Sequence, residues 1–97
     1  MRNEVQWSEQ VRRFVAAQAP ESRKRLRAGI RGLGSERGEI EALVDDLLGY
    51  KRLRVGGFRV VYREAFERGV PVRKCLFVER RSLVYELFRK MVLDDIR

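Results

Sequence analysis

Apolar residues near the start of the chain recur with the spacing of two helices. One stripe follows Ser8, a common helix cap, and comprises Val11, Phe14 and Val15. A second stripe follows Pro20, which suits a first helical turn, and comprises Leu26, Ile30 and Leu33. Gly34 ends the second stripe. The pattern predicts a helical hairpin, preceded by a short edge strand over residues 4–7.

The middle of the chain changes to the alternation that is typical of β-strands. Apolar and polar residues alternate over residues 50–55, 58–66 and 72–78. Gly56-Gly57 joins the first two segments, and Gly69-Val70-Pro71 is expected to form the turn before the third. These segments predict a three-strand antiparallel meander.

Helical spacing returns at the end of the chain. Residues 80–82 are expected to start a final helix with Ser82 as its cap. The apolar stripe of this helix comprises Val84, Leu87, Phe88, Met91 and Val92. Between Gly34 and Gly49 we predict a loop and a short turn that help to cover the core.

The order of these elements predicts an α+β fold. We expect a small antiparallel sheet, made of the short N-terminal strand and the meander, with the N-terminal helical hairpin and the C-terminal helix packed on one side of it. The length of 97 residues suits one domain, residues 1–97, with a single modest core.

The charge of the chain points to an anionic partner. The net charge is +8, and arginine greatly outnumbers lysine. A guanidinium group can contact phosphate with two donors and can stack on a base, which favours nucleic acid or a strongly acidic protein as partner. Acidic residues gather over residues 36–46. We interpret this segment as charge balance, the alternative being that it keeps the basic site from binding polyanions indiscriminately.

Arginines form a row on the predicted meander. Arg52 and Arg54 share the side of the first strand opposite its apolar residues, and Arg59 and Arg63 do the same on the second. No acid occurs from residue 50 to residue 63, so we expect these guanidinium groups to have no local partner and to meet phosphates.

Composition argues against several other classes of site. Cys75 is the only cysteine, lies in an apolar run and is expected to be buried; the chain has no histidine. We therefore expect no disulfide, no zinc site and no cofactor. No apolar stretch is long enough to span a bilayer, and none has the features of a signal peptide, so we expect a cytoplasmic protein.

Three parts of the sequence resemble the RelE/ParE toxins of bacterial toxin–antitoxin systems. They are Trp7-Ser8 at the start of the first helix, the run Leu48-Gly49-Tyr50-Lys51-Arg52-Leu53-Arg54-Val55-Gly56 followed by Phe58-Arg59-Val60-Val61-Tyr62, and the segment from Phe77 to Tyr85. The resemblance implies a toxin that is held silent by a cognate antitoxin. It also implies a choice between two activities, RNA cleavage in RelE-like members and inhibition of DNA gyrase in ParE-like members.

The resemblance to the RelE-like branch implies a set of site residues. The positions that match its active site are Arg52, Arg54, Arg59, Arg81 and Tyr85, with Arg80 as an alternative to Arg81. This late arginine and tyrosine favour RNA cleavage. Lys51, Arg80 and Arg63 are further candidates for RNA contact.

Metal-free RNA cleavage assigns a role to each of these residues. Arg59 and Arg81 would clamp the phosphate, and Arg52 and Arg54 would align the RNA backbone or act as acid. Tyr85 would act as base, because nearby cations favour a phenolate, or as a platform on which a base stacks. Relatives often carry lysines on the catalytic strand and a histidine near the position of Arg81. This chain has Tyr50 and Arg52 on that strand, with Lys51 on the opposite face, and it has no histidine, so the identity of the general base stays open.

Other interpretations of the same residues stay open as well. Tyr85 could be an aromatic at the edge of the core, and Arg63 an ordinary residue of the sheet surface. The resemblance implies cleavage of mRNA on the ribosome, which orients the substrate. The alternatives are a non-enzymatic inhibitor of DNA gyrase and an attenuated relative that only binds nucleic acid or antitoxin. In each case we expect an antitoxin whose acidic, amphipathic segment wraps the helices and blocks or distorts the arginine face, and we expect the antitoxin to set the oligomeric state.

Overall fold

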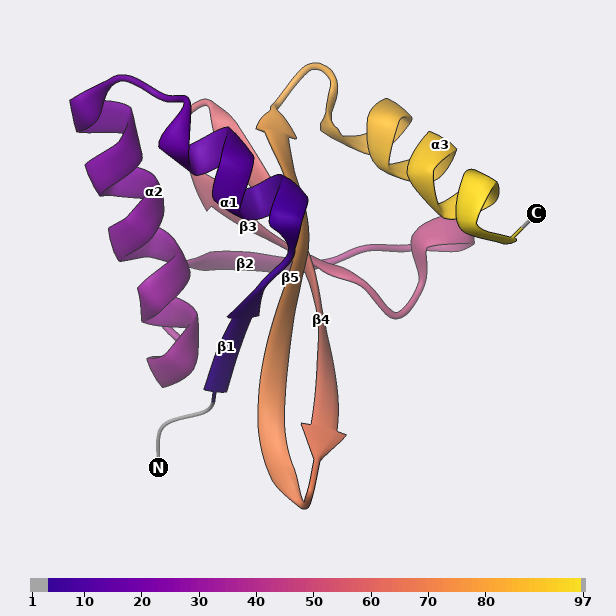
Figure 1. Ribbon diagram of the computed structural model, residues 1–97. Helices are drawn as coiled ribbons and strands as arrows, with labels where there is room; N and C mark the ends of the chain where they lie inside the picture. The colour runs from indigo at the N-terminus through magenta and orange to yellow at the C-terminus, as the bar shows by residue number, and fades with distance from the viewer. Residues whose placement is uncertain (1–3, 97) are drawn as a thin grey trace.

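The computed structural model describes residues 4–96, and it has the α+β fold that the sequence predicts (Figure 1). Three α-helices and five strands follow one another along the chain. In order they are β1 (Glu4–Trp7), α1 (Glu9–Ala16), α2 (Pro20–Gly32), β2 (Glu39–Ala42), β3 (Lys51–Val55), β4 (Phe58–Glu67), β5 (Val70–Arg80) and α3 (Val84–Ile96). Short 3₁₀ turns, Leu33–Ser35 and Asp45–Leu47, flank β2.

The strands form one sheet in the order β1-β5-β4-β3-β2. The predicted meander is confirmed, since β3, β4 and β5 pair antiparallel. The N-terminal strand β1 pairs parallel with β5, so the sheet is mixed. The pairing of β4 with β5 shifts register between Val61 and Tyr62, which is a β-bulge. The long β4–β5 hairpin extends well beyond the rest of the sheet (Figure 1).

The segment between Gly34 and Gly49 was expected to be a loop, and this prediction is wrong for β2. The sequence of β2 alternates acidic and less polar residues, and it pairs with β3 at the edge of the sheet. All four residues of β2 are exposed. The strand is therefore held by its ladder with β3 rather than by burial, which explains why its hydrophobicity gives little signal.

Helices α1 and α2 cover one face of the sheet. Ser8 caps α1 as expected, because its hydroxyl oxygen accepts a hydrogen bond from the backbone N of Val11 at 3.2 Å. A side chain at Gly29 would bring its Cβ within 2.7 Å of Val55, so glycine lets α2 approach β3 closely. The core on this face comprises Val11, Val15, Leu26, Ile30, Leu33, Leu53, Val60, Tyr62, Cys75 and Val78.

Helix α3 packs on the opposite face, so the expectation that all helices lie on one side is wrong (Figure 1). A second core between α3 and the sheet comprises Leu47, Val61, Phe77, Val84 and Phe88. Successive residues of a strand point to opposite faces, and Val60, Val61 and Tyr62 are all buried. A strand with consecutive buried residues needs a layer on each side, which the second core supplies.

The connection from β5 to α3 differs from the prediction at Ser82. The helix begins at Val84, one residue later than a cap at Ser82 implies, and its first turn is closed by a hydrogen bond from Leu87 N to Leu83 O. Residues 81–83 form a turn instead, and Arg81 N donates to Gly57 O at 2.9 Å. This bond fixes the start of α3 against the glycine turn between β3 and β4.

The β4–β5 turn also lies earlier than predicted. Arg68 and Gly69 form it with φ angles of 53° and 77°. Val70 and Pro71 belong to β5, where they pair with Glu67 and Phe66. The turn needs left-handed backbone, which glycine adopts readily and proline cannot.

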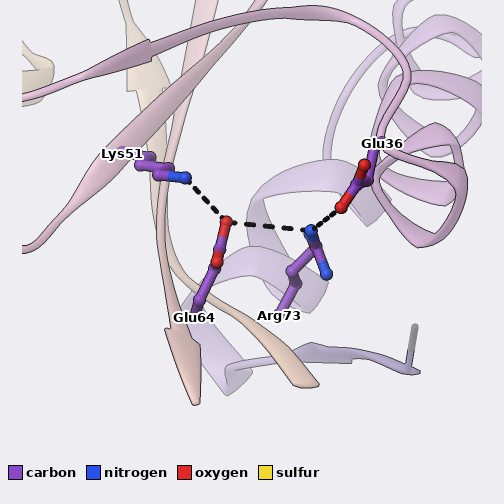
Figure 2. Close-up of polar contacts among 4 residues, drawn as sticks. All are labelled: Glu36, Lys51, Glu64 and Arg73. Carbon is purple, nitrogen blue, oxygen red and sulfur yellow. Dashed lines mark hydrogen bonds and ion pairs between the residues drawn. The ribbon is translucent and has the colours of Figure 1, made fainter. Parts of the chain in front are cut away.

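A chain of ionic contacts links the segment after α2 to the sheet (Figure 2). Arg73 Nη2 lies 3.0 Å from Glu36 and 3.7 Å from Glu64, and Lys51 Nζ lies 2.7 Å from the same Glu64 oxygen. The Arg73 side chain is only 7% exposed. Hydrogen bonding from Lys51 is the main cause that lowers the pKa of Glu64.

Within residues 4–96, no helix is both long enough and apolar enough to cross a membrane.

Candidate functional site

Arg59 occupies the centre of the candidate site, at the start of β4 and on the face that α3 covers. Its Nη1 donates to Gly56 O and to Phe58 O, both at 2.9 Å. The residue is 7% exposed. Two backbone carbonyls therefore hold one end of the guanidinium group, and among the residues that the structure describes no carboxylate forms an ion pair with it.

The charges around Arg59 are mostly positive. Burial is the largest cause of a lowered pKa at Arg59. The charges of Arg54, Arg52 and Arg81 lower this pKa further, in that order, and Tyr85 acts in the opposite sense. The other four predicted catalytic positions thus lie close enough to act electrostatically on Arg59, although they come from β3, the turn before α3 and α3 itself. We call these five residues the arginine cluster.

Arg52 and Arg54 do have partners, which corrects the prediction that the row of arginines is unpaired. Arg52 Nη2 lies 2.6 Å from Glu41 Oε2, and Arg54 Nε lies 3.5 Å from Glu39 Oε2. Both carboxylates come from β2, whose register places Glu39 opposite Arg54 and Glu41 opposite Arg52. The prediction failed because the partners come from a strand that was not recognised.

Arg81 lies in the turn before α3, and Tyr85 lies in the first turn of that helix. The Arg81 side chain is exposed, and in the described part of the chain it forms no ion pair. Tyr85 is half-buried and packs against the second core, so it is in part the core-edge aromatic that the sequence also allowed. It still lies close enough to Arg59 for their electrostatic interaction to raise the pKa of Arg59.

The three further RNA-contact candidates lie around the arginine cluster rather than in it. Lys51 pairs with Glu64 on the face that α1 and α2 cover. Arg63 lies four residues beyond Arg59 along β4, opposite Lys74. Arg80 pairs in register with Phe58, and its side chain is exposed. Of the two arginines that the sequence left as alternatives, Arg81 acts electrostatically on Arg59.

Glu79 is a residue that sequence reasoning missed. It stands opposite Arg59 in the antiparallel register of β5, and such pairs share a face of the sheet. Its carboxylate accepts a hydrogen bond from the backbone N of Arg80 at 2.6 Å rather than pairing with Arg59. The alternation of β5 could have identified it, because Phe77 and Glu79 are two residues apart and point to the same side.

The cluster has the chemistry of a site for an oxyanion. Like charges directly opposite each other, as at Arg54 and Arg59, destabilise a sheet when no anion is present. A phosphate placed between them would offset this repulsion and accept charge-assisted hydrogen bonds from several guanidinium groups. Tyr85 supplies the one hydroxyl group of the cluster, which can accept or donate a proton.

Comparison with known proteins identifies the fold. The sequence matches no protein-family model and no curated protein. The structure is similar to a chain of the toxin–antitoxin complex RelBE2 from Mycobacterium tuberculosis, with a TM-score of 0.68, 21% identity, and coverage of 84% of this chain and 94% of that one. It is also similar to the YoeB/ParE toxin from Agrobacterium tumefaciens, with a TM-score of 0.65, 17% identity, and coverage of 80% and 98%.

A third similar structure is the RelB–RelE antitoxin–toxin complex from Methanococcus jannaschii, with a TM-score of 0.57 and 17% identity, covering 86% of this chain and 98% of that one. At such identities, similarity establishes a shared fold. The fold that the resemblance to RelE/ParE toxins implied is therefore confirmed.

Proposed function

We propose that this protein is the toxin of a type II toxin–antitoxin system and that it cleaves mRNA on the ribosome without a metal ion. The observation that carries the proposal is the arginine cluster, in which Arg81 and Tyr85 both act electrostatically on Arg59, and Arg59 and Arg81 form no ion pair within the described residues. The fold shared with RelE and YoeB/ParE proteins supports the toxin role. The proposed place of action is the cytoplasm, where translating ribosomes are found.

The proposed reaction is attack of a ribose 2′-oxygen on the adjacent phosphorus. Tyr85, as the general base, takes the 2′-hydroxyl proton, and the 2′-oxygen forms a bond to phosphorus as the bond to the leaving 5′-oxygen breaks. The products are a 2′,3′-cyclic phosphate and a 5′-hydroxyl group. Arg59 and Arg81 bind the phosphorane oxygens as negative charge develops. Arg52 or Arg54 aligns the backbone or supplies the proton to the leaving oxygen.

The backbone contacts of Arg59 suit this role. Because Gly56 O and Phe58 O already orient its guanidinium group, little reorganisation is needed when the phosphorane forms. With no histidine in the chain, proton transfer rests on groups that are poorly matched to neutral pH. We therefore propose that the ribosome orients the mRNA and raises the rate through positioning.

We further propose that a cognate antitoxin binds a groove between α2 and the sheet. The groove encloses about 770 Å³. Trp7 and Val55 contribute apolar surface, and Arg27, Arg31 and Arg37 contribute positive charge. These properties complement an acidic, amphipathic segment.

Substitutions in the cluster test the nuclease. We expect Arg59→Gln to lower the rate of mRNA cleavage on programmed ribosomes by about 10²- to 10³-fold, as for loss of one oxyanion donor. Tyr85→Phe is expected to lower it by about 10²- to 10⁴-fold, because the proton acceptor is lost. Arg13→Gln, which removes an exposed arginine from α1, is the control and should keep the parental rate.

The same variants distinguish the nuclease from a gyrase inhibitor. The pairing of Arg52 and Arg54 with β2 carboxylates is the observation that favours a role in binding alone. After induction, labelled amino-acid uptake should stop before DNA synthesis does, and only in cells with the parent or Arg13→Gln. Arrest of DNA synthesis first, with both cluster variants as toxic as the parent, would reject the nuclease.

A further inference from the structure

A hollow of about 610 Å³ lies beside the arginine cluster, on the other side of the glycine turn. Three segments meet there, and all three lie at the top of the view in Figure 1: the α1–α2 joint, the β3–β4 turn and the β5–α3 connection. The side chains that matter for binding are Gln18, Ser22, Phe58, Arg80 and Arg81. The volume is within the range of sites that hold small ligands.

The lining of the hollow suits a nucleotide. Two guanidinium groups, from Arg80 and Arg81, border it, and none of its described lining residues is acidic. The Phe58 ring is only half-buried, so it leaves surface for contact with a base. Gln18 Nε2 donates to Phe14 O at 3.1 Å, whereas its Oε1 accepts no hydrogen bond within residues 4–92 and can meet a base edge.

The hollow is continuous with the arginine cluster through two residues. Arg81 lines the hollow and also acts on the charge of Arg59. Gly57 lines it too, and its carbonyl oxygen accepts the hydrogen bond from Arg81 N. An RNA strand whose phosphate lies at Arg59 can therefore cross the glycine turn with its next nucleotide entering the hollow.

We propose that this hollow is a subsite for the nucleotide that flanks the scissile phosphate, with Arg80 holding its phosphate and Phe58 and Gln18 contacting its base. This inference rests on the proposed function and adds to it a determinant of cut-site preference. A nucleotide is the occupant because the hollow combines cationic, aromatic and hydrogen-bonding groups next to a site for a phosphate.

Gly57→Leu tests the subsite by filling it. A Cβ at Gly57 would meet no atom within 4 Å, so a side chain there can enter the hollow without displacing the fold. Arg80→Gln is the second variant, since it removes one cation from an exposed position. Arg68→Gln is the matched control for charge, because Arg68 lies in the β4–β5 turn, far along the hairpin from the hollow.

Two measurements keep the inference separate from the proposed function. The first maps cut sites by 5′-end sequencing on ribosomes programmed with mRNA that carries a randomised codon. The second measures binding of a short 2′-O-methyl RNA, which cannot be cleaved, by fluorescence anisotropy. We expect Gly57→Leu to abolish a base preference at one flanking position. Gly57→Leu and Arg80→Gln, the two variants of the hollow, should each bind the oligonucleotide about tenfold more weakly. This is the effect expected for the loss of one stacking or phosphate contact. Arg68→Gln should match the parent, and thermal unfolding verifies that all variants are folded.

Each outcome decides one of the two ideas. Cleavage with the same cut-site profile and the same affinity in both hollow variants would overturn the subsite and leave the nuclease. Absence of cleavage by the parent, together with oligonucleotide binding that both variants weaken, would overturn the nuclease and support the subsite. Absence of both cleavage and binding in the parent would overturn both.

Discussion

At the scale of single residues, ion pairs separate cations that serve the fold from cations that serve the site. Lys51 and Arg73 share the carboxylate of Glu64, whereas Arg59 donates to backbone carbonyls. Lys51 would have to give up its carboxylate partner before it could bind a phosphate, whereas Arg59 has backbone partners that leave it free to bind one. Lys51 was a candidate for RNA contact, yet its contacts resemble those of a structural residue.

The Lys51–Glu64 pair gives a prediction about stability and pH. The pKa of Glu64 is held below its ordinary value of 4.5, chiefly by the hydrogen bond from Lys51. Because this pKa is lowered in the folded state, the ionised Glu64 carboxylate adds to the free energy of unfolding above pH 4.5. This contribution is lost as the pH falls through the pKa that Glu64 has in the folded protein. Glu64→Gln should therefore lower the free energy of unfolding by roughly 1 kcal/mol or less at pH 7 and by less in acid.

Urea unfolding of the parent, Glu64→Gln, Lys51→Met and the double variant at a series of pH values measures this effect. The coupling free energy between the two positions should be positive at pH 7 and should approach zero below the folded pKa of Glu64. A coupling that stays constant through the acid range would show that the pair does not act through the charge of the carboxylate.

At the scale of elements, the sequence predicts the strands whose alternation includes buried apolar residues and misses β2, which is short and fully exposed. The predicted meander is confirmed because β3 to β5 carry alternating apolar residues and are separated by glycine turns. Strand β2 was missed because its side chains are exposed and its main stabilising contact, the ladder with β3, is distant in sequence. The carboxylate partners of Arg52 and Arg54 could not be predicted for the same reason.

The position of α3 was missed for a different reason, although a signal was present. Val60, Val61 and Tyr62 are consecutive apolar residues, and such a run requires packing on both faces of the sheet. Arg52, Arg54 and Arg59 lie on the same face, and their charges are typical of a solvated surface rather than of one that a helix covers. The site residues themselves came from the resemblance, and their roles stay predictions.

Strand β2 gives the prediction that belongs to this scale. Glu39 and Glu41 neutralise Arg54 and Arg52, so the double change Glu39→Gln and Glu41→Gln should free both guanidinium groups. Naked single-stranded RNA should then bind more tightly at low salt. The slope of log K against log salt should become steeper by about 1.4, as for two added phosphate contacts.

The measurement is a titration of labelled RNA at several salt concentrations, with the double variant Glu9→Gln and Glu21→Gln as control for net charge. Both control positions are exposed on the helical hairpin. Equal slopes in the two double variants would mean that β2 only balances charge. A steeper slope for the β2 variant would show that β2 restrains binding of polyanions.

At the scale of the whole molecule, the site depends on two cores that lie on opposite faces of one sheet. Arg52, Arg54 and Arg59 are fixed by the strands, whereas Arg81 and Tyr85 depend on how α3 is placed. Phe88 fixes α3 through edge contacts with Tyr50, at a centroid distance of 5.0 Å, and tilted contacts with Phe77 at 6.1 Å. Loosening this core should therefore separate the base from the phosphate clamp.

Phe88→Ala and Leu26→Ala test this division, because both residues are fully buried but lie in different cores. Each change should cost about 2 to 5 kcal/mol of stability, the usual range for removing such a side chain. Assays at low temperature, with Phe88→Leu as a milder change, keep the protein folded. We expect cleavage to fall by about tenfold or more in the Phe88 variants and little in Leu26→Ala, because only α3 carries Tyr85. Amide hydrogen exchange should be faster in α3 for the Phe88 variants alone. An equal loss of cleavage in the Phe88 variants and in Leu26→Ala would show instead that the site depends on global stability.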